Sequence, residues 1–298
     1  MNGPETDILL TMTARAPIAH GSFSDVDTGN ATMLRREPIV SLPGHPRVPC
    51  LSGNSLRGQL RRHVMRDIFE RCGLSRDSFT LDARQWDRLY AALANGGHLD
   101  GSEARVRIDA RRQLRASLPP LSCFGAALYS YMLEGRFEQG FAWPVCDETI
   151  ACGWFDGPSP GRAEDLLTDT SIARHVDRDY HAPETSGVTP MPTSIEAFAP
   201  GARLVSRITF RRGATEVERS VVAYGLSMIR GVGAKSGAGF GVVDLDVAGG
   251  DAAPYRAWLD ENKDAATHAL RELAERLGQR PEKKRGKGKG NAKRDAAA

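Results

Sequence analysis

Strand-like and helical patterns alternate along this chain in an order that few folds allow. Apolar and polar residues alternate, as in a β-strand, over residues 7–15, 202–212 and 240–247. Helical spacing follows the first of these runs at 54–72 and the second at 217–229. With one more strand expected between residues 140 and 156, the order is βαββαβ. We therefore predict an α+β fold with a ferredoxin-like (RRM-like) core, a helical insertion and a thumb-like loop.

The segments outside these patterns complete the expected organisation. Prolines crowd residues 156–200, where they would interrupt a helix or a sheet ladder, and they predict a projecting loop or hairpin. Residues 280–298 carry eight Lys or Arg against two acids, which is typical of a disordered tail and leaves the other 279 residues with a net charge of −3. We expect the first part of the core at 1–73, a mainly helical insertion at 74–150, the thumb-like loop region at 151–200, the second part of the core at 201–250, a C-terminal helix at 251–279 and a basic disordered tail at 280–298.

Composition excludes several other classes of protein. A hydrophobic share of 41% with 26% charged residues is typical of a globular protein. No run of about 18 uncharged apolar residues could span a bilayer, and the first residues lack the pattern of a signal peptide, so we expect a cytoplasmic protein without a membrane partner. The five cysteines are scattered and fit neither a metal knuckle nor a redox pair, so we expect reduced thiols, no metal site and no cofactor.

A glycine-rich loop at residues 230–246 reads RGVGAKSGAGFGVVDLD. A Walker loop is excluded because Ala234, not glycine, precedes Lys235 and Ser236. A dinucleotide fingerprint is excluded because this loop follows a predicted helix and precedes a predicted strand, which reverses the required order. Glycine lets the main chain approach another surface closely, so the loop could present its N–H groups to a phosphodiester backbone. A tight connection that binds nothing would also use glycines.

The start of the first predicted helix is a second candidate site. Ser52 or Asn54 can cap this helix, and free N–H groups at a helix start favour an anion. Four arginines lie off the apolar stripe formed by Leu56, Leu60, Val64 and Ile68: Arg57, Arg61, Arg62 and Arg66. An ordinary amphipathic helix with a solvated arginine face would show the same pattern.

Three segments of the sequence resemble one protein family. Gly231-Val232-Gly233, five further residues and Gly239-Phe240-Gly241 resemble the GhGxxxxxGhG loop of the RAMP superfamily, the ferredoxin-like RNA-binding proteins of CRISPR systems. VPCLSGNSLRGQLRR at 48–62 is similar to the segment that opens the first helix of backbone subunits in this superfamily. IEAFAPGARLVSRITF at 195–210 resembles the segment that leads from the thumb into the next core strand. The resemblance is greatest to the backbone subunit of type IV systems.

The resemblance implies a function and a set of contacts. It implies a non-catalytic backbone subunit that polymerises along CRISPR RNA, head to tail in a helical filament, and presents the guide to target DNA or RNA beside other CRISPR effector subunits. The residues that it implies for RNA binding are Ser52, Asn54, Ser55, Arg57, Arg61, Arg230, Gly231, Gly233, Lys235, Ser236, Gly239 and Gly241. The residues that it implies for wedging between bases are Tyr180, His181 and Met191.

Two catalytic alternatives stay open within the same superfamily. A processing endonuclease could use His20 as a general base or acid, because a histidine titrates near neutral pH. A backbone subunit like those of type III systems could cleave target RNA with Asp25 or Asp27. Counting back from the helix start places Asn30 nearest to the cleaving position, and an amide is no carboxylate base, so we expect a subunit that does not cut.

Overall fold

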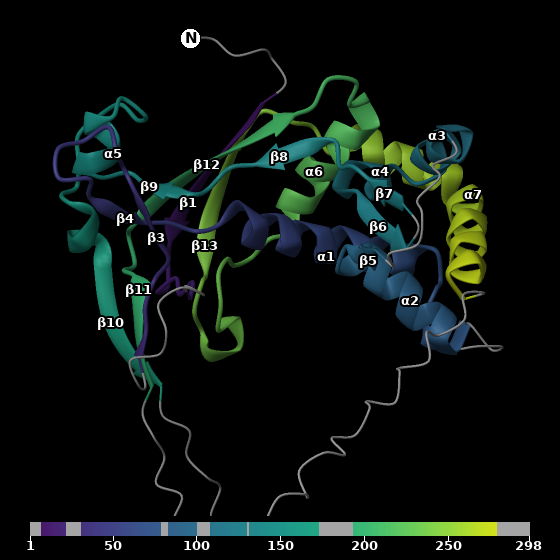
Figure 1. The fold of residues 1–298 in the computed structure, drawn as a ribbon, viewed down its shortest axis with the longest axis horizontal. Helices are drawn as coiled ribbons and strands as arrows, with labels where there is room; N and C mark the ends of the chain where they lie inside the picture. Colours follow the sequence, from purple (N-terminus) through teal and green to yellow (C-terminus); the bar gives the residue numbers. More distant parts are fainter. Residues whose placement is uncertain are drawn as a thin grey trace, which may run out of the picture.

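The computed structural model describes residues 7–21, 31–78, 83–99, 108–129, 131–172 and 193–278. These residues form a mixed α+β structure with several sheets whose pairs are mostly antiparallel, which confirms the α+β part of the prediction (Figure 1). No helix in this part of the chain is both long and apolar enough to cross a bilayer. Tyr180, His181, Met191, Asp25 and Asp27 lie outside the described residues, and so does the basic tail.

The central sheet joins the two ends of the predicted core. Its strands, in spatial order, are β13 (Val243–Ala248), β1 (Ile8–Ala14), β12 (Arg203–Phe210) and β8 (Phe137–Gln139), and the short β9 (Trp143–Pro144) also pairs with β12. All of these pairs are antiparallel. Because side chains alternate along a strand, Ile8, Leu10 and Met12 are buried on one face, whereas Leu9 and Thr11 lie on the other.

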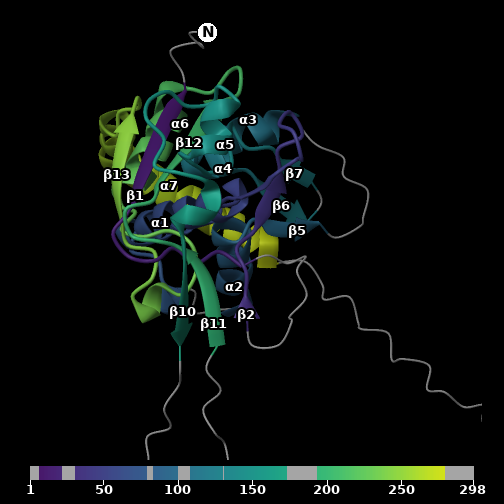
Figure 2. The ribbon, with the colours of Figure 1, turned by 90° about the vertical axis from the view of Figure 1, so that its left-hand side faces the viewer.

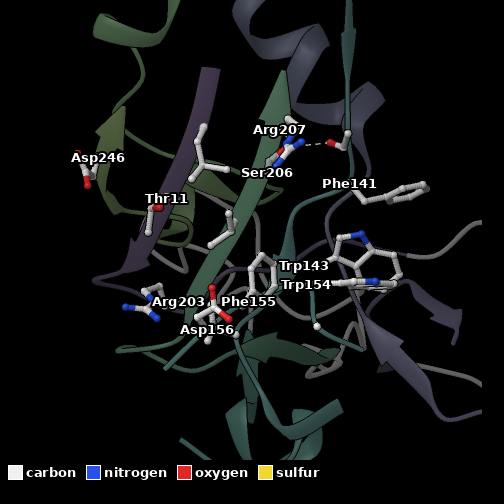
Figure 3. A pocket seen from close by; sticks show the side chains of 15 residues that line it. Thr11, Phe141, Trp143, Trp154, Phe155, Asp156, Arg203, Ser206, Arg207 and Asp246 are labelled. Atoms are coloured by element: carbon white, nitrogen blue, oxygen red, sulfur yellow. Dashed lines mark hydrogen bonds between the residues drawn. The ribbon is translucent and has the colours of Figure 1, made fainter. Parts of the chain in front are cut away.

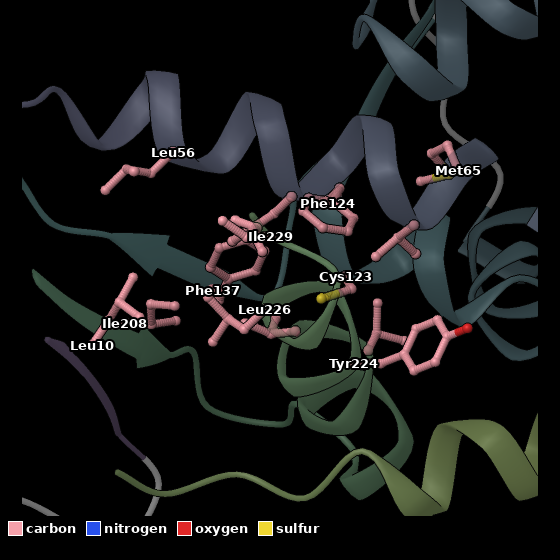
Figure 4. Close-up of a cluster of buried hydrophobic side chains, with 14 of the residues drawn as sticks. Leu10, Leu56, Met65, Cys123, Phe124, Phe137, Ile208, Tyr224, Leu226 and Ile229 are labelled. Carbon is pink, nitrogen blue, oxygen red and sulfur yellow. The ribbon is translucent and has the colours of Figure 1, made fainter. Parts of the chain in front are cut away.

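Two helices cover the buried face of this sheet. They are α1 (Gly53–Arg71) and α6 (Glu216–Ser227) (Figure 1). Leu10 and Ile208 from the sheet, Leu56 from α1 and Leu226 from α6 belong to the same buried cluster (Figure 4). A fully buried side chain of this kind contributes about 1.5–3 kcal/mol, so the packing of the two helices on the sheet stabilises the core.

The two helices cross closely because the sequence supplies a glycine at their contact. A Cβ added to Gly225 of α6 would lie 2.9 Å from Val64 Cγ2 and 3.2 Å from Leu60 Cδ2 of α1.

The start of α6 is fixed by a capping box, in which the Thr215 hydroxyl accepts the Glu218 N–H and the Glu218 carboxylate accepts the Thr215 N–H.

A second body of short elements packs beside α1. It comprises α2 (Ala83–Ala94), β5 (Gly97–Leu99), α3 (Ile108–Ser117), α4 (Pro119–Phe124), β6 (Ala126–Tyr129) and β7 (Tyr131–Leu133), preceded by a 3-10 turn at Arg76–Ser78. The long α7 (Ala253–Gly278), kinked at Asn262, packs against α2 and α6. The range 74–150, which the sequence suggested was mainly helical, thus holds these strands as well. Of the strand expected at 140–156, the structure has only the two residues of β9, and β8 ends just before this range at Gln139.

The third body is a projecting β-hairpin. It consists of β10 (Leu167–Ile172) and β11 (Thr193–Phe198), extended by the parallel β2 (Ala31–Thr32), and it leaves the central sheet in one direction (Figures 1 and 2). A short hairpin of β3 (Arg36–Pro38) and β4 (Arg47–Pro49) lies at its base, near α5 (Asp147–Ala151) and a 3-10 turn at Ala163–Leu166. Arg36 and Glu196 join the two hairpins through paired hydrogen bonds of 2.6 and 2.7 Å.

The five cysteines are free thiols in the structure, as expected. Four of them are buried and Cys152 is half-buried. Burial raises the pKa of Cys50 to about 12, so this thiol stays protonated and unreactive near neutral pH.

Candidate nucleic-acid interface

The glycine-rich loop forms a hairpin that projects beyond the sheet, on the same side as β10 and β11 (Figures 1 and 2). Gly231 pairs with Val242 across its base, and the Val232 N–H donates to the Gly241 carbonyl at 2.8 Å. The segment at residues 17–19 holds the hairpin from the side, since the Ala234 N–H donates to the Ala19 carbonyl at 2.7 Å. The loop is therefore an ordered element with a defined tip.

Three of the five glycines are explained by close contacts inside the protein. A Cβ on Gly241 would lie 2.1 Å from the Val232 carbonyl oxygen, one on Gly233 would lie 2.4 Å from the Ala19 oxygen, and one on Gly231 would lie 3.0 Å from the Gly241 oxygen. Gly239 has a φ of +85°, which favours glycine for conformational reasons. Gly237 has neither a positive φ nor any atom within 4 Å of an added Cβ. Most of these glycines therefore build the hairpin, and only its tip is open to a ligand.

The hairpin tip presents unused donors to solvent. Residues 234–239 are all exposed, and Lys235 holds a left-handed backbone with a φ of 63°. Within the described residues, no hydrogen bond uses the N–H groups of Lys235, Ser236 or Gly237, and no carboxylate pairs with the Lys235 ammonium. A phosphate would satisfy both kinds of donor.

The start of α1 is capped by the chain itself. The Ser52 hydroxyl accepts the Ser55 N–H at 3.2 Å, and the Ser52 N–H donates to His20 Nε2 at 3.1 Å. Asn54 is exposed and Ser55 is half-buried. Among the predicted contacts at this helix start, Asn54 is thus the side chain most open to a ligand.

His20 connects the segment after β1 to α1. Burial and, to a smaller extent, the charge of Arg35 lower the pKa of His20 below its ordinary value. The neutral ring fits the observed contact, because Nε2 must keep its lone pair to accept the Ser52 N–H. The nitrogen that a general base would use is therefore already engaged.

Arg57 and Arg61 are directed into the protein. Arg57 donates to the Phe124 carbonyl at 2.7 Å and lies over the Phe137 ring, 5.0 Å from its centroid. Arg61 donates to the carbonyls of Ala92, Leu93 and Gly125, at the ends of α2 and α4. Burial lowers the pKa of Arg61 to about 10. Both guanidinium groups thus join α1 to the second body.

Arg62 and Arg66 occupy the exposed side of α1. Both are exposed, and no carboxylate in the described residues forms an ion pair with either. Gln59 lies on the same side, one turn earlier, and its Nε2 donates to the Gly233 carbonyl at 3.2 Å. Burial and the charges of Arg66 and Arg62 lower the pKa of His63, which lies between them. This side of α1 therefore presents unpaired positive charge next to the glycine-rich hairpin.

Helix geometry explains why the four-residue spacing did not separate Arg57 and Arg61 from Arg62 and Arg66. A helix turns by about 100° per residue, so a four-residue repeat advances by about 40° at each step. The apolar stripe from Leu56 to Ile68 therefore winds around the helix, and at Ile68 it faces nearly the same direction as Arg57 and Arg61. A helical wheel of the whole helix would have placed Arg62 and Arg66 opposite the core.

Arg230 lies at the end of α6 and is exposed. Its guanidinium donates to the Ser227 carbonyl at 3.1 Å and the Ile229 carbonyl at 3.3 Å, which satisfies carbonyls at the helix end. No group of three or more His, Cys, Asp or Glu in the described ranges could hold a metal ion.

The candidate interface thus combines two elements. One is the hairpin tip with Lys235 and the N–H groups of Ser236 and Gly237, and the other is the exposed side of α1 with Arg62 and Arg66. Gln59 joins them. Such a surface has several positive charges and main-chain donors and is suited to a polyanion.

Comparison with solved structures gives a fold relative. Over 81% of this chain and 90% of the other, the structure superimposes on a chain of a Type IV-B CRISPR complex with a TM-score of 0.53 and 20% sequence identity. A chain of the Type III-B Cmr-beta complex bound to cognate target RNA matches at a TM-score of 0.41 and 14% identity, over 82% of this chain and 61% of that one. No protein-family model matches the chain, and no curated protein matches it either. The resemblance that the three sequence segments predicted is confirmed at the level of the fold, which this chain shares with a component of a type IV CRISPR complex.

Proposed function

We propose that this chain is a non-catalytic backbone subunit of a CRISPR ribonucleoprotein, which binds along CRISPR RNA and presents the guide for pairing. The fold shared with a chain of a Type IV-B CRISPR complex supports membership of a CRISPR ribonucleoprotein. The unpaired arginines of α1 beside the open tip of the glycine-rich hairpin are the observation that carries the proposal.

The core of this subunit is a ferredoxin-like βαββαβ unit. Counting β1, β8, β12 and β13 as its first to fourth strands, the spatial order is fourth, first, third, second, and neighbouring strands are antiparallel. The helix α1 connects the first two strands, and α6 connects the last two. This order supports the assignment, with the second body and the β10–β11 hairpin as additions to it.

The RNA backbone lies across the tip of the hairpin and the exposed side of α1. The N–H groups of Ser236 and Gly237, together with Lys235, hold one phosphate, and Arg62 and Arg66 hold neighbouring ones. Such contacts position a strand without reading its sequence. The bases remain free to pair with target DNA or RNA.

The assembly is a filament of copies of this chain along the RNA. Head-to-tail contacts between identical subunits do not close upon themselves, so the RNA length sets the number of copies. In this arrangement Tyr180, His181 and Met191, which lie between β10 and β11 in the sequence, wedge between bases. Other CRISPR effector subunits belong to the same complex.

The subunit does not cut RNA. The engaged Nε2 of His20 supports this, because that nitrogen would need to be free to take a proton from a ribose hydroxyl. Cleavage by Asp25 or Asp27 is the catalytic alternative. A gel of wild-type protein incubated with repeat RNA and with target RNA, with and without Mg²⁺, tests both alternatives. Fragments that disappear in His20→Ala, Asp25→Asn or Asp27→Asn would refute the non-catalytic assignment.

The RNA contacts are tested by co-expression with a repeat-spacer transcript. Arg62→Glu combined with Arg66→Glu should reduce the retained RNA by tenfold or more, because two phosphate contacts become repulsive. Each phosphate contact contributes about 0.7 to the salt slope for a single strand, so the slope should fall by about 1.4.

A double variant of equal charge change is the control. Arg212 and Arg271 are exposed and form no ion pair within the described residues; Arg212 lies in the turn after β12, and Arg271 lies on α7. Arg212→Glu with Arg271→Glu should retain RNA like the wild type. Equal losses in the two double variants would mean that net charge, not this interface, holds the RNA.

A further inference from the structure

The face of the central sheet opposite α1 and α6 carries a groove of about 800 Å³ (Figure 3). Its floor consists of the outward side chains of β1 and β12, among them Leu9, Thr11 and Val205. Leu9 is 40% exposed, so this part of the sheet is open to solvent. The groove lies on the other face from the α1 surface described above and therefore plays no part in that RNA interface.

Aromatic side chains form one wall of the groove. Trp143 of β9 and Trp154, which follows α5, contact each other with ring centroids 5.0 Å apart and an interplanar angle of 61°. Phe155 lies beside them, toward the middle of the groove (Figure 3). Trp154 is 45% exposed, whereas tryptophan is usually mostly buried in a folded protein. An indole face left open beside a groove is suited to stacking with a flat ring.

Charged groups of both signs lie around the same groove. Arg203 and Arg207 project from β12, Asp246 projects from β13, and Asp156 follows the aromatic wall. Of these, only Arg207 forms an ion pair with a described residue, a long one of 3.9 Å to Asp7. Two positive and two negative groups leave the groove without net charge.

Neutrality and the mixture of groups identify the kind of ligand. A phosphate would meet two carboxylates as well as two guanidinium groups, so a phosphate backbone has little to gain here. A lipid or another purely apolar ligand would leave four charged groups without partners. A flat, neutral ring with both hydrogen-bond donors and acceptors on its edges could stack on the tryptophan and form hydrogen bonds with the arginines and carboxylates at the same time.

We propose that this groove binds a nucleobase of a single-stranded nucleic acid, with guanine as the best match. The base stacks on Trp154, and an arginine donates to its O6 and N7 acceptors, the pairing that arginine makes most often with guanine. A carboxylate accepts from its N1–H and exocyclic amino group. The sugar and phosphate face solvent, so the groove holds a base that has turned away from its neighbours.

Saturation-transfer NMR with GMP and the full-length chain, freed of nucleic acid, tests the proposal. This measurement detects ligand protons close to the protein and needs no tryptophan signal. The base proton H8 of GMP should receive the strongest transfer, and UMP should bind at least threefold more weakly. Ribose 5-phosphate, which has the sugar and phosphate without a base, should show no transfer.

Two substitutions at one position provide the matched comparison. Trp154→Leu keeps an apolar side chain but removes the aromatic face, and it should weaken GMP binding about tenfold. Trp154→Phe keeps a ring and should bind within about threefold of the wild type. Circular dichroism of both variants shows whether the fold is retained.

Four results would overturn the proposal. They are the absence of transfer to H8, equal transfer to ribose 5-phosphate, unchanged GMP binding in Trp154→Leu, and a concentration-dependent burial of Trp154 that shows a second copy of the chain in the groove. The outcome is independent of the RNA interface on α1. Arg62→Glu with Arg66→Glu should keep the GMP signal, and Trp154→Leu should keep the guide RNA.

Discussion

Arg61 and Arg62 are neighbours in sequence with opposite expected roles, and their substitution separates stability from binding. Arg61→Ala removes the donor to three buried carbonyls, those of Ala92, Leu93 and Gly125. Arg62→Ala removes an exposed side chain that forms no ion pair with a described residue. We expect the first variant to lose stability with its RNA contacts intact, and the second to lose RNA with its stability intact.

The magnitude for Arg61→Ala follows from its contacts. A buried acceptor left without a donor costs about 1–3 kcal/mol, and the lower value applies because a pocket of about 300 Å³ beside Arg61 admits water. Three carbonyls therefore cost about 3 kcal/mol. The lowered pKa of Arg61 shows that burial disfavours its charge, so removing that charge returns part of this cost and leaves a net loss of about 2 kcal/mol.

Thermal unfolding followed by circular dichroism measures the effect. A loss of about 2 kcal/mol should lower Tm by about 3 °C in a chain of this size, whereas Arg62→Ala should change Tm by less than about 1 °C. An Arg61→Ala protein as stable as the wild type would refute the structural role of this side chain. RNA lost in Arg61→Ala but retained in Arg62→Ala would refute the proposed interface.

Three further predictions concern the hairpin, the segment after β1 and the contact between the two small hairpins. Gly241→Ala should lower the free energy of unfolding by more than about 3 kcal/mol, because the φ of +81° and a carbonyl oxygen 2.1 Å from the added Cβ both oppose a side chain. Gly237→Ala should change it by no more than about 0.5 kcal/mol. Equal urea midpoints of the two variants would contradict this. The pKa of His20 is lowered in the folded protein, so the unfolded chain binds this proton more tightly. The free energy of unfolding of the wild type should therefore be independent of His20 above about pH 6.5 and should decrease as the pH drops below that value. If the Tm of His20→Gln decreased by the same amount over this pH range, the result would count against this role of His20. Glu196→Gln should cost about 2 kcal/mol, because Arg36 would lose its shorter and more buried carboxylate partner and keep only the more exposed Glu164 at 3.2 Å. An unchanged unfolding midpoint would show that the Arg36–Glu196 pair contributes nothing.

Most of the core could be predicted from periodicity. The limits of β1, α1, β12 and α6 lie within one or two residues of the sequence patterns, because each element buries one complete apolar face. The strand at 140–156 was harder to predict, since β8 and β9 have three and two residues and too few alternations to show a period. The strands at 97–99 and 126–133 were missed for the same reason.

The candidate site could be predicted only in part. Lys235 and Ser236 are exposed at the hairpin tip, as expected. This could be predicted because the glycine motif identifies the loop from a continuous stretch of sequence. Arg57 and Arg61 matched the motif as well, but their side chains are used by the carbonyls of α2 and α4. Neither helix is recognisable as a neighbour of α1 from local sequence. The Trp143 and Trp154 groove depends on contacts between separate segments and has no local signal.

The segment at residues 17–19 holds two projections of the molecule at once. Ile18 pairs with Phe198 of β11, and Ala19 pairs with Ala234 of the glycine-rich hairpin. The distance between the two projections is thus set by adjacent residues of one extended chain, which has little freedom to stretch. In a subunit that coats RNA, such a connection would fix the distance between the two projections. Every copy would then cover the same length of the strand, independent of its nucleotide sequence.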